Sequence, residues 1–193
     1  QVGYTGNFAG VSRTWYGDKE DAWTQARIRL RGSRSETTEG VLLNRFSGIS
    51  GSVNGPLLSY VEVGYDRFDR TWNGVVFEER LNRIYANFTP VSGLKLGLFL
   101  RHGDKIDFAN TRLGTVTNIQ PELTANIGRS LSIQIDHNYE RLSRDGGDVY
   151  VANLTDLRIS YQFSLRQRLR VAWLRGDFER DPMLSGPGVQ PRD

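Results

Sequence analysis

The segment from Ser130 to Glu140 reads SLSIQIDHNYE, and it decides the fold. Leu131, Ile133, Ile135, His137 and Tyr139 alternate with polar residues throughout the segment. Because a strand points successive side chains to opposite faces, this segment has one mostly apolar face and one polar face. The alternation predicts a β-strand.

The same alternation recurs along the chain. It is clear in six further segments, which are 25–31, 81–89, 94–102, 118–127, 157–163 and 168–173, and weaker in 3–16, 41–53 and 57–69. The sequence therefore predicts about ten strands and no helix, because no segment repeats its apolar residues every 3.6 positions over a sufficient length. Strands of about ten residues are typical of tilted membrane crossings, whereas strands of soluble proteins average about five or six.

The predicted connections alternate in length. Residues 54–56, 91–93, 128–129 and 164–167 form short turns, while the polar stretches 69–80, 102–114 and 143–148 are predicted to be longer loops. Short turns at one end and longer loops at the other are typical of bacterial outer-membrane barrels. Aromatic residues near strand ends would suit the interfacial girdles of such barrels; they are Trp23, Tyr65, Phe68, Phe88, Tyr139, Tyr161, Phe163 and Trp173.

These patterns predict an all-β fold, an antiparallel up-and-down transmembrane β-barrel of about ten strands that is a segment of a larger barrel. Residues 1–193 form one barrel domain or barrel segment, with an irregular tail over 182–193. The alternative is a soluble β-sandwich or lipocalin-like barrel, because alternation alone does not say which face is inside. In that alternative, Trp15, Trp72 and Trp173 would be stacking platforms for a carbohydrate or small ligand.

Composition narrows the possible functions. The chain has no Cys and only two His, which excludes thiolate chemistry and disfavours a histidine metal centre. Its 25 basic and 22 acidic residues are nearly balanced, so we expect no nucleic-acid partner. We find no Gly-x-Ser-x-Gly elbow and no carboxylate pair with a motif behind it, and so expect no enzyme and no cofactor.

The polar faces carry many charged residues. We expect them to line the lumen of the barrel, where Glu62, Asp66 and Asp156 would join them. The candidates are Arg27, Arg29, Arg31, Arg83, Arg101, Glu122, Asp136, Glu140, Arg158, Arg168 and Arg170. Charges in a narrow barrel must be paired or hydrated. The favoured interpretation is an ion-paired filling of side chains, and the alternative is a polar channel that attracts anionic or sugar-like solutes.

One loop carries a candidate metal site. Asp104, Asp107 and Asn110 lie close together in the stretch 102–114 and could offer oxygen ligands to Ca²⁺. Their spacing does not match an EF-hand, and a hydrogen-bond network within the loop explains them equally well.

The second half of the chain resembles a known family. The segments that carry the resemblance are GDKIDFANTRLG at 103–114, NIGR at 126–129, HNYERL at 137–142 and YQFSLR at 161–166. In order and spacing they resemble the C-terminal barrel domain of a bacterial family of unknown function. Full-length members usually carry an N-terminal carbohydrate-binding domain of the family-9 type. The resemblance extends over about 55–181 and implies an outer-membrane barrel of unassigned activity, without a catalytic site.

The chain departs from those members in two respects. It has no family-9-like domain, and relatives continue with further strands after residues 187–193. These departures indicate a segment of a larger barrel or one subunit of a composite barrel. The alternation and the resemblance together predict a bacterial outer-membrane protein, porin-like in build, that acts as a pore, transport element or scaffold. Its expected partners are membrane lipid and other segments or subunits of a larger barrel.

Overall fold

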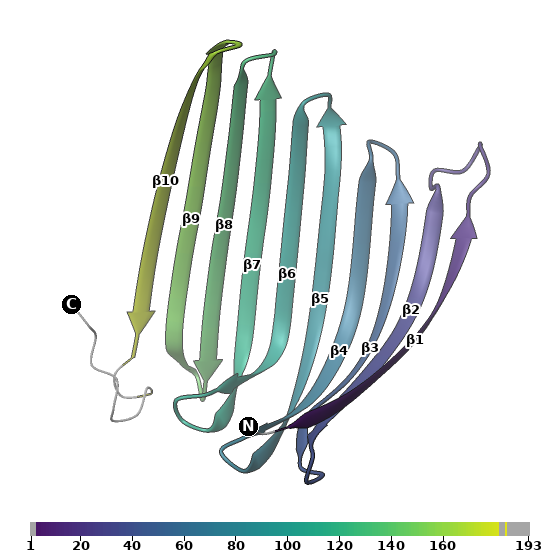
Figure 1. Cartoon of the computed structure of the whole chain (residues 1–193), viewed down its shortest axis with the longest axis vertical. Helices are drawn as coiled ribbons and strands as arrows, with labels where there is room; N and C mark the ends of the chain where they lie inside the picture. Colours follow the sequence, from purple (N-terminus) through teal and green to yellow (C-terminus); the bar gives the residue numbers. More distant parts are fainter. Residues whose placement is uncertain (1–2, 182–183, 185–193) are drawn as a thin grey trace.

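The computed structural model describes residues 3–181 and Leu184. It consists of ten β-strands (Figure 1). They are β1 (Tyr4–Tyr16), β2 (Gln25–Thr37), β3 (Leu42–Gly55), β4 (Ser59–Trp72), β5 (Val75–Val91), β6 (Leu94–Asp107), β7 (Arg112–Ile127), β8 (Leu131–Arg144), β9 (Gly147–Ser164) and β10 (Gln167–Arg180). All ten predicted strands are confirmed. Most of the predicted irregular tail at 182–193 lies outside the described residues.

The strands form one antiparallel up-and-down sheet. Each pairs with its neighbours in chain order, from β1 to β10. The described part of the chain contains no helix long and apolar enough to span a membrane. The all-β, up-and-down fold predicted from the alternation is therefore confirmed.

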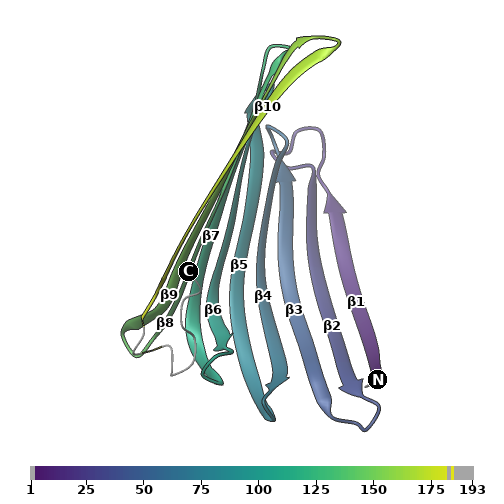
Figure 2. The same cartoon turned by 60° about the vertical axis from the view of Figure 1, so that its left-hand side comes forward.

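The sheet is open rather than closed. Within the described residues, β1 pairs only with β2 and β10 only with β9, so each keeps one free edge. Figures 1 and 2 show a curved, twisted wall with these two strands at its opposite margins. The structure thus shows one open antiparallel sheet, and the closed barrel stays a prediction.

The polar stretches predicted to be long loops are strands. Residues 69–72, 75–80, 102–107, 112–114 and 143–144 extend the strands on either side, and tight turns join them. Asn73 and Gly74 have φ values of 48° and 76°, and Asp145 and Gly146 of 52° and 82°. Two central residues with positive φ are typical of the type I′ hairpin turn, which Asn-Gly and Asp-Gly favour. The predicted asymmetry of loop length is wrong, because a strand with polar residues on both faces has the composition of a loop.

Gly103 occupies a position on β6 that a side chain cannot enter. Its φ is 147°, and a Cβ atom added there would lie 2.0 Å from the backbone oxygen of Arg80 on β5. Pairing between β5 and β6 reaches Leu81 and Gly103 and continues from there toward the turn at Val91. The two strands diverge beyond this point, so Gly103 allows β6 to bend away from β5.

We expect Gly103→Ala to lower the free energy of unfolding by about 2 kcal/mol, because backbone must shift to admit the methyl group. Gly51→Ala on β3 is the matched control, since no heavy atom lies within 4 Å of its added Cβ. Denaturant titration followed by tryptophan fluorescence measures both variants. Equal stability of the two would show that the bend at Gly103 is not constrained.

The two faces of the sheet differ in exposure. On β3, Ser50 is 5% exposed and the adjacent Ile49 is 47% exposed. A single-layer sheet exposes both faces equally unless it curves, so the sheet curves toward the face of Ser50. We call this the polar face; across the neighbouring strands it also carries Arg31, Asp66 and Arg83. The opposite, apolar face carries Leu30, Ile49 and Ile84 and is the more exposed.

The turns at 56–58, 92–93, 128–130 and 165–166 lie at one end of the sheet and are here called the short turns. A small apolar core lies at the opposite end. It consists of Leu81, Val116, Leu142 and Val149, all nearly inaccessible, with three further side chains packed against it: Phe68, Tyr150 and Leu184. Val116 and Leu142 are register partners on the polar face. Phe68, predicted for an interfacial girdle, is thus part of this inner cluster, and that prediction is wrong.

Candidate functional site

An apolar band crosses the apolar face at the end that carries the short turns. The border of the band on the side away from those turns is formed by one residue from each strand, β2 to β10. These residues are Leu30, Ile49, Tyr65, Ile84, Leu100, Ile119, Tyr139, Leu157 and Trp173. Between this border and the turns, the residues on the apolar face are almost all apolar. On β6 they are Leu94, Leu96, Leu98 and Leu100. The band is continuous because the register brings each member beside an apolar neighbour, as Ile84 beside Leu100.

The height of the band fits a bilayer. On β8 it runs from Leu131 to Tyr139. Eight residue steps in a strand span about 27 Å, or about 20 Å along the axis at the tilt usual in membrane barrels. The apolar belt of such barrels is about 25 Å tall. Tyr65, Tyr139 and Trp173 lie at one border, and Phe88, Tyr161 and Phe163 lie near the turns at the other.

Beyond the border the same face becomes charged and ion-paired. Arg67 pairs with Glu78 across β4 and β5 at 2.6 Å, and Arg141 pairs with Asp148 at 2.5 Å. The other pairs in this zone are Arg34–Glu36, Arg45–Asp69, Arg67–Asp69, Arg80–Glu78 and Arg175–Asp177. The outward surface is therefore divided into an apolar zone and a hydrophilic zone along the length of the strands.

The polar face holds its charges in two networks. In the first, Arg83 on β5 donates from Nε to Asp66 at 2.7 Å and from Nη1 to Glu62, both on β4. Arg31 on β2 lies 3.9 Å from Asp66. Arg83, Glu62 and Asp66 are 18%, 12% and 11% exposed at their side chains. This network joins three strands through mostly shielded charges.

The second network centres on Glu140 of β8. It accepts from Arg101 at 3.1 Å, from Lys105 at 2.5 Å and from the Tyr150 hydroxyl at 2.6 Å. Arg101 and Lys105 belong to β6, so their side chains reach across β7 to meet Glu140. Contacts between strands two apart require side chains to converge, which agrees with a sheet curved toward its polar face.

The predicted lumen candidates all lie on the polar face, as their register partners require. Arg31, Arg83, Arg101 and Glu140 join the two networks, and Arg158 pairs with Asp156 at 2.5 Å. Arg27 donates to the Thr14 hydroxyl, and Asp136 accepts from Gln134. Among the described residues, the rest make no salt bridge or side-chain hydrogen bond; they are Arg29, Glu122, Arg168 and Arg170. That these residues line a lumen stays a prediction.

Of the three candidate metal ligands, the structure brings only Asp107 and Asn110 together. Asp107 accepts from Asn110 at 2.6 Å and pairs with Arg112 at 3.1 Å, so a guanidinium already lies at this carboxylate. Asp104 instead accepts a hydrogen bond from the backbone N–H of Arg80. Across residues 3–181, no group of three or more His, Asp or Glu gathers in a way that could hold a metal ion. The structure favours the hydrogen-bond network over the Ca²⁺ site.

Three charged or polar members of the polar face were missed, because Glu79 and Lys105 fall in stretches predicted to be loops and Tyr150 lies between the predicted loop 143–148 and the predicted strand 157–163. Lys105 and Tyr150 belong to the Glu140 network, and the nearly inaccessible Glu79 pairs with Arg70 at 3.2 Å. Lys105 shares the odd-numbered face of Arg101, so extending the alternation past Gly103 would have found it.

The tryptophans proposed for a soluble ligand site are far apart. Trp15 lies on β1 and Trp173 on β10, the two margins of the sheet, while Trp72 packs edge-on against Phe108 with centroids 5.0 Å apart. They do not form one stacking platform.

We compared the chain with known protein families, curated proteins and solved structures, and none matches. The class of protein therefore rests on the geometry described above: an antiparallel wall with an exposed apolar band on one face and an ion-paired polar face opposite.

Proposed function

We propose that this chain is part of the wall of a bacterial outer-membrane β-barrel that acts as a pore, transport element or scaffold. The apolar band supports the proposal most directly. It crosses β2 to β10 on the more exposed face, whereas a soluble barrel or sandwich buries its apolar rows. The lipid of the bilayer is the partner that such a band fits.

The position of the band suggests how the wall sits in the membrane. The band adjoins the short turns, and the strands continue past it into the ion-paired zone. With the turns beside the band toward the periplasm, the hydrophilic ends of the strands would project outward from the membrane. The polar face would then line the lumen, with the Arg83 and Glu140 networks as its paired filling.

Closure would come from further strands. Within the described residues, β1 and β10 each have one edge that no other strand pairs with, and hydrocarbon does not tolerate an open sheet edge. Because β1 and β10 run in opposite directions, an even number of added strands completes an antiparallel barrel. Other segments or subunits of a larger barrel are the proposed source, in keeping with the resemblance to the barrel domain of a family of unknown function.

We expect the purified protein to require detergent and, unboiled, to migrate differently from a boiled sample on a denaturing gel, because closed membrane barrels resist unfolding by the detergent of the gel. The measurement is extraction with and without detergent followed by electrophoresis of both samples. Conductance across a planar bilayer then separates a pore from a scaffold. A chain that stays monomeric and soluble without detergent would refute the membrane proposal. It would favour the alternative, a soluble β-barrel or β-sandwich that binds a carbohydrate or small ligand.

A further inference from the structure

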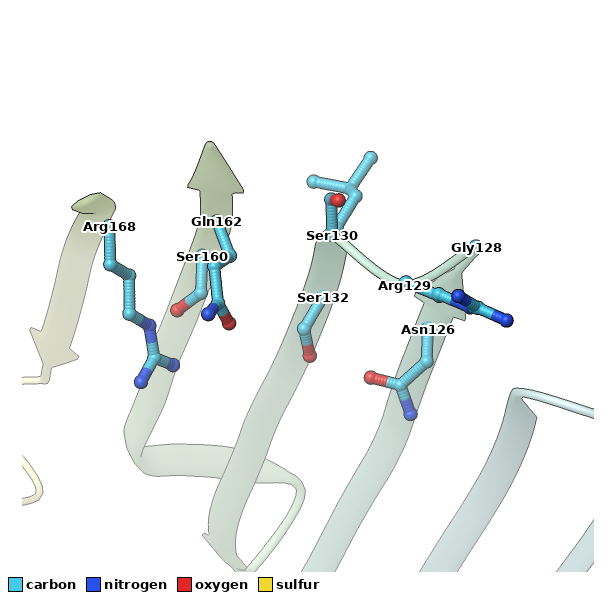
Figure 3. Close-up of a pocket in the computed structure, with 9 residues that line it drawn as sticks. Asn126, Gly128, Arg129, Ser130, Ser132, Ser160, Gln162 and Arg168 are labelled. Carbon is cyan, nitrogen blue, oxygen red and sulfur yellow. The ribbon is translucent and has the colours of Figure 1, made fainter. Parts of the chain in front are cut away.

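A polar pocket lies on the polar face close to the short turns (Figure 3). Its volume is about 250 Å³, and it is lined from β7, β8, β9 and β10. The side chains that matter are Asn126, Arg129, Ser132, Ser160, Gln162 and Arg168. Together with Ser130, they supply two guanidinium groups, two amides and three hydroxyls, and no carboxylate lines the pocket.

Charge is unevenly distributed around this pocket. Residues 123–135 and 157–174 contain five arginines and no Asp or Glu. Of these arginines, only Arg158 forms a salt bridge within the described residues, with Asp156. The nearest carboxylates on these strands are Glu122, Asp136 and Asp156, which are register neighbours farther from the turns. The pocket therefore lies in a locally positive field.

The donors of the pocket are free to bind a ligand. In the described residues, the side chains of Arg129, Arg168, Gln162 and Asn126 make no hydrogen bond, in contrast to the closed networks at Arg83 and Glu140. Figure 3 shows Arg168, Gln162, Ser132 and Asn126 along the same stretch of adjacent strands, whereas the Arg129 side chain on the β7–β8 turn points away from Arg168. The planar Arg168 guanidinium, flanked by hydroxyls and amides, matches the oxygens of an oxyanion.

We infer that this pocket binds the phosphate group of a small solute at the turn end of the barrel. The inference deepens the proposed function and rests on it for one point, the access of the pocket from a lumen. A phosphate fits better than a carboxylate, because it offers more oxygens to the several donors. A soluble solute fits better than a lipid headgroup, because the pocket opens on the face opposite the apolar band.

The test is calorimetric titration of inorganic phosphate into the refolded full chain in octyl glucoside, a detergent without phosphate. We expect saturable binding that added NaCl weakens. Arg168→Gln is expected to bind phosphate about tenfold more weakly, since a charged hydrogen-bond donor is lost. Arg175→Gln is the matched control, because Arg175 lies on the opposite face of β10 and pairs with Asp177. It should bind as the unchanged chain does.

Three results would overturn the inference. They are the absence of phosphate binding by the unchanged chain, equal binding by the two variants, and a preference for short-chain phosphatidylglycerol that survives Arg168→Gln and so reports a lipid site. Arg168→Lys serves if Arg168→Gln fails to refold, and it should bind with intermediate strength. Detergent dependence is scored separately. If the chain binds phosphate but needs no detergent, the phosphate site is supported and the membrane barrel is refuted. If the chain needs detergent but binds no phosphate, the membrane barrel is supported and the phosphate site is refuted.

Discussion

Replacing Arg83 by Met is expected to lower the free energy of unfolding by about 3 kcal/mol, because it leaves two shielded carboxylates, Glu62 and Asp66, without their shared cation. Removing one partner of a shielded ion pair costs far more than the pair itself contributes, since the remaining charge keeps its desolvation penalty. The measurement is denaturant unfolding of the protein refolded in detergent micelles or lipid vesicles.

Arg80→Met provides the comparison within the same strand. Arg80 also pairs with a carboxylate, Glu78, but its side chain is 61% exposed. An exposed pair contributes little, so we expect Arg80→Met to cost much less stability than Arg83→Met. Adding Glu62→Gln and Asp66→Asn to Arg83→Met should restore part of the stability by removing the uncompensated charges. A loss for Arg83→Met no larger than for Arg80→Met would mean that water reaches this network freely.

Leu123→Arg on β7 is expected to destabilise the protein in vesicles by about 3 kcal/mol, because it places a charge in the middle of the apolar band. Leu123 lies between its register partners Leu96 on β6 and Ile135 on β8. In a bilayer these neighbours face hydrocarbon, where arginine cannot be hydrated. Unfolding from vesicles measures the loss, and a reduced yield of membrane-inserted protein should accompany it.

Thr115→Arg is the matched control for this substitution. Thr115 lies on the same strand and face, but it is exposed beyond the border of the band, beside Asp104 and Ser143. Arginine there is expected to change the stability by no more than about 0.5 kcal/mol. If Leu123→Arg is tolerated as well as Thr115→Arg, the band does not contact hydrocarbon and the membrane proposal fails.

The strands were predictable from sequence because one physical rule governs them. Where one face is apolar and the other polar, as in Leu131–Tyr139, alternation marks both the strand and its two faces. The rule fails where both faces are polar. Residues 78–80 and 143–144 belong to β5 and β8 beyond the apolar band, so no contrast between faces remains there to distinguish a strand from a loop.

The candidate site was predictable only in part for a related reason. Alternation placed Arg83, Arg101 and Glu140 on the polar face, but which charges meet depends on register and curvature. Lys105 reaches Glu140 across an intervening strand, a contact between positions 35 residues apart that no local pattern encodes. Phe68 illustrates the same limit, since its membership of the inner cluster follows from the packing of the sheet at that end.

The two free margins of the sheet differ in their risk of aggregation. β10 carries arginines at 168, 170 and 175, and charges along a margin oppose pairing with a second molecule. β1 has no charged residue from Tyr4 to Ser12 and no proline, so nothing in its sequence prevents it from templating a foreign strand. As long as its edge is open, β1 is thus the place where misassembly into fibrils or inclusion bodies would begin. The proposed further strands or subunits would therefore need to pair with β1 early in assembly.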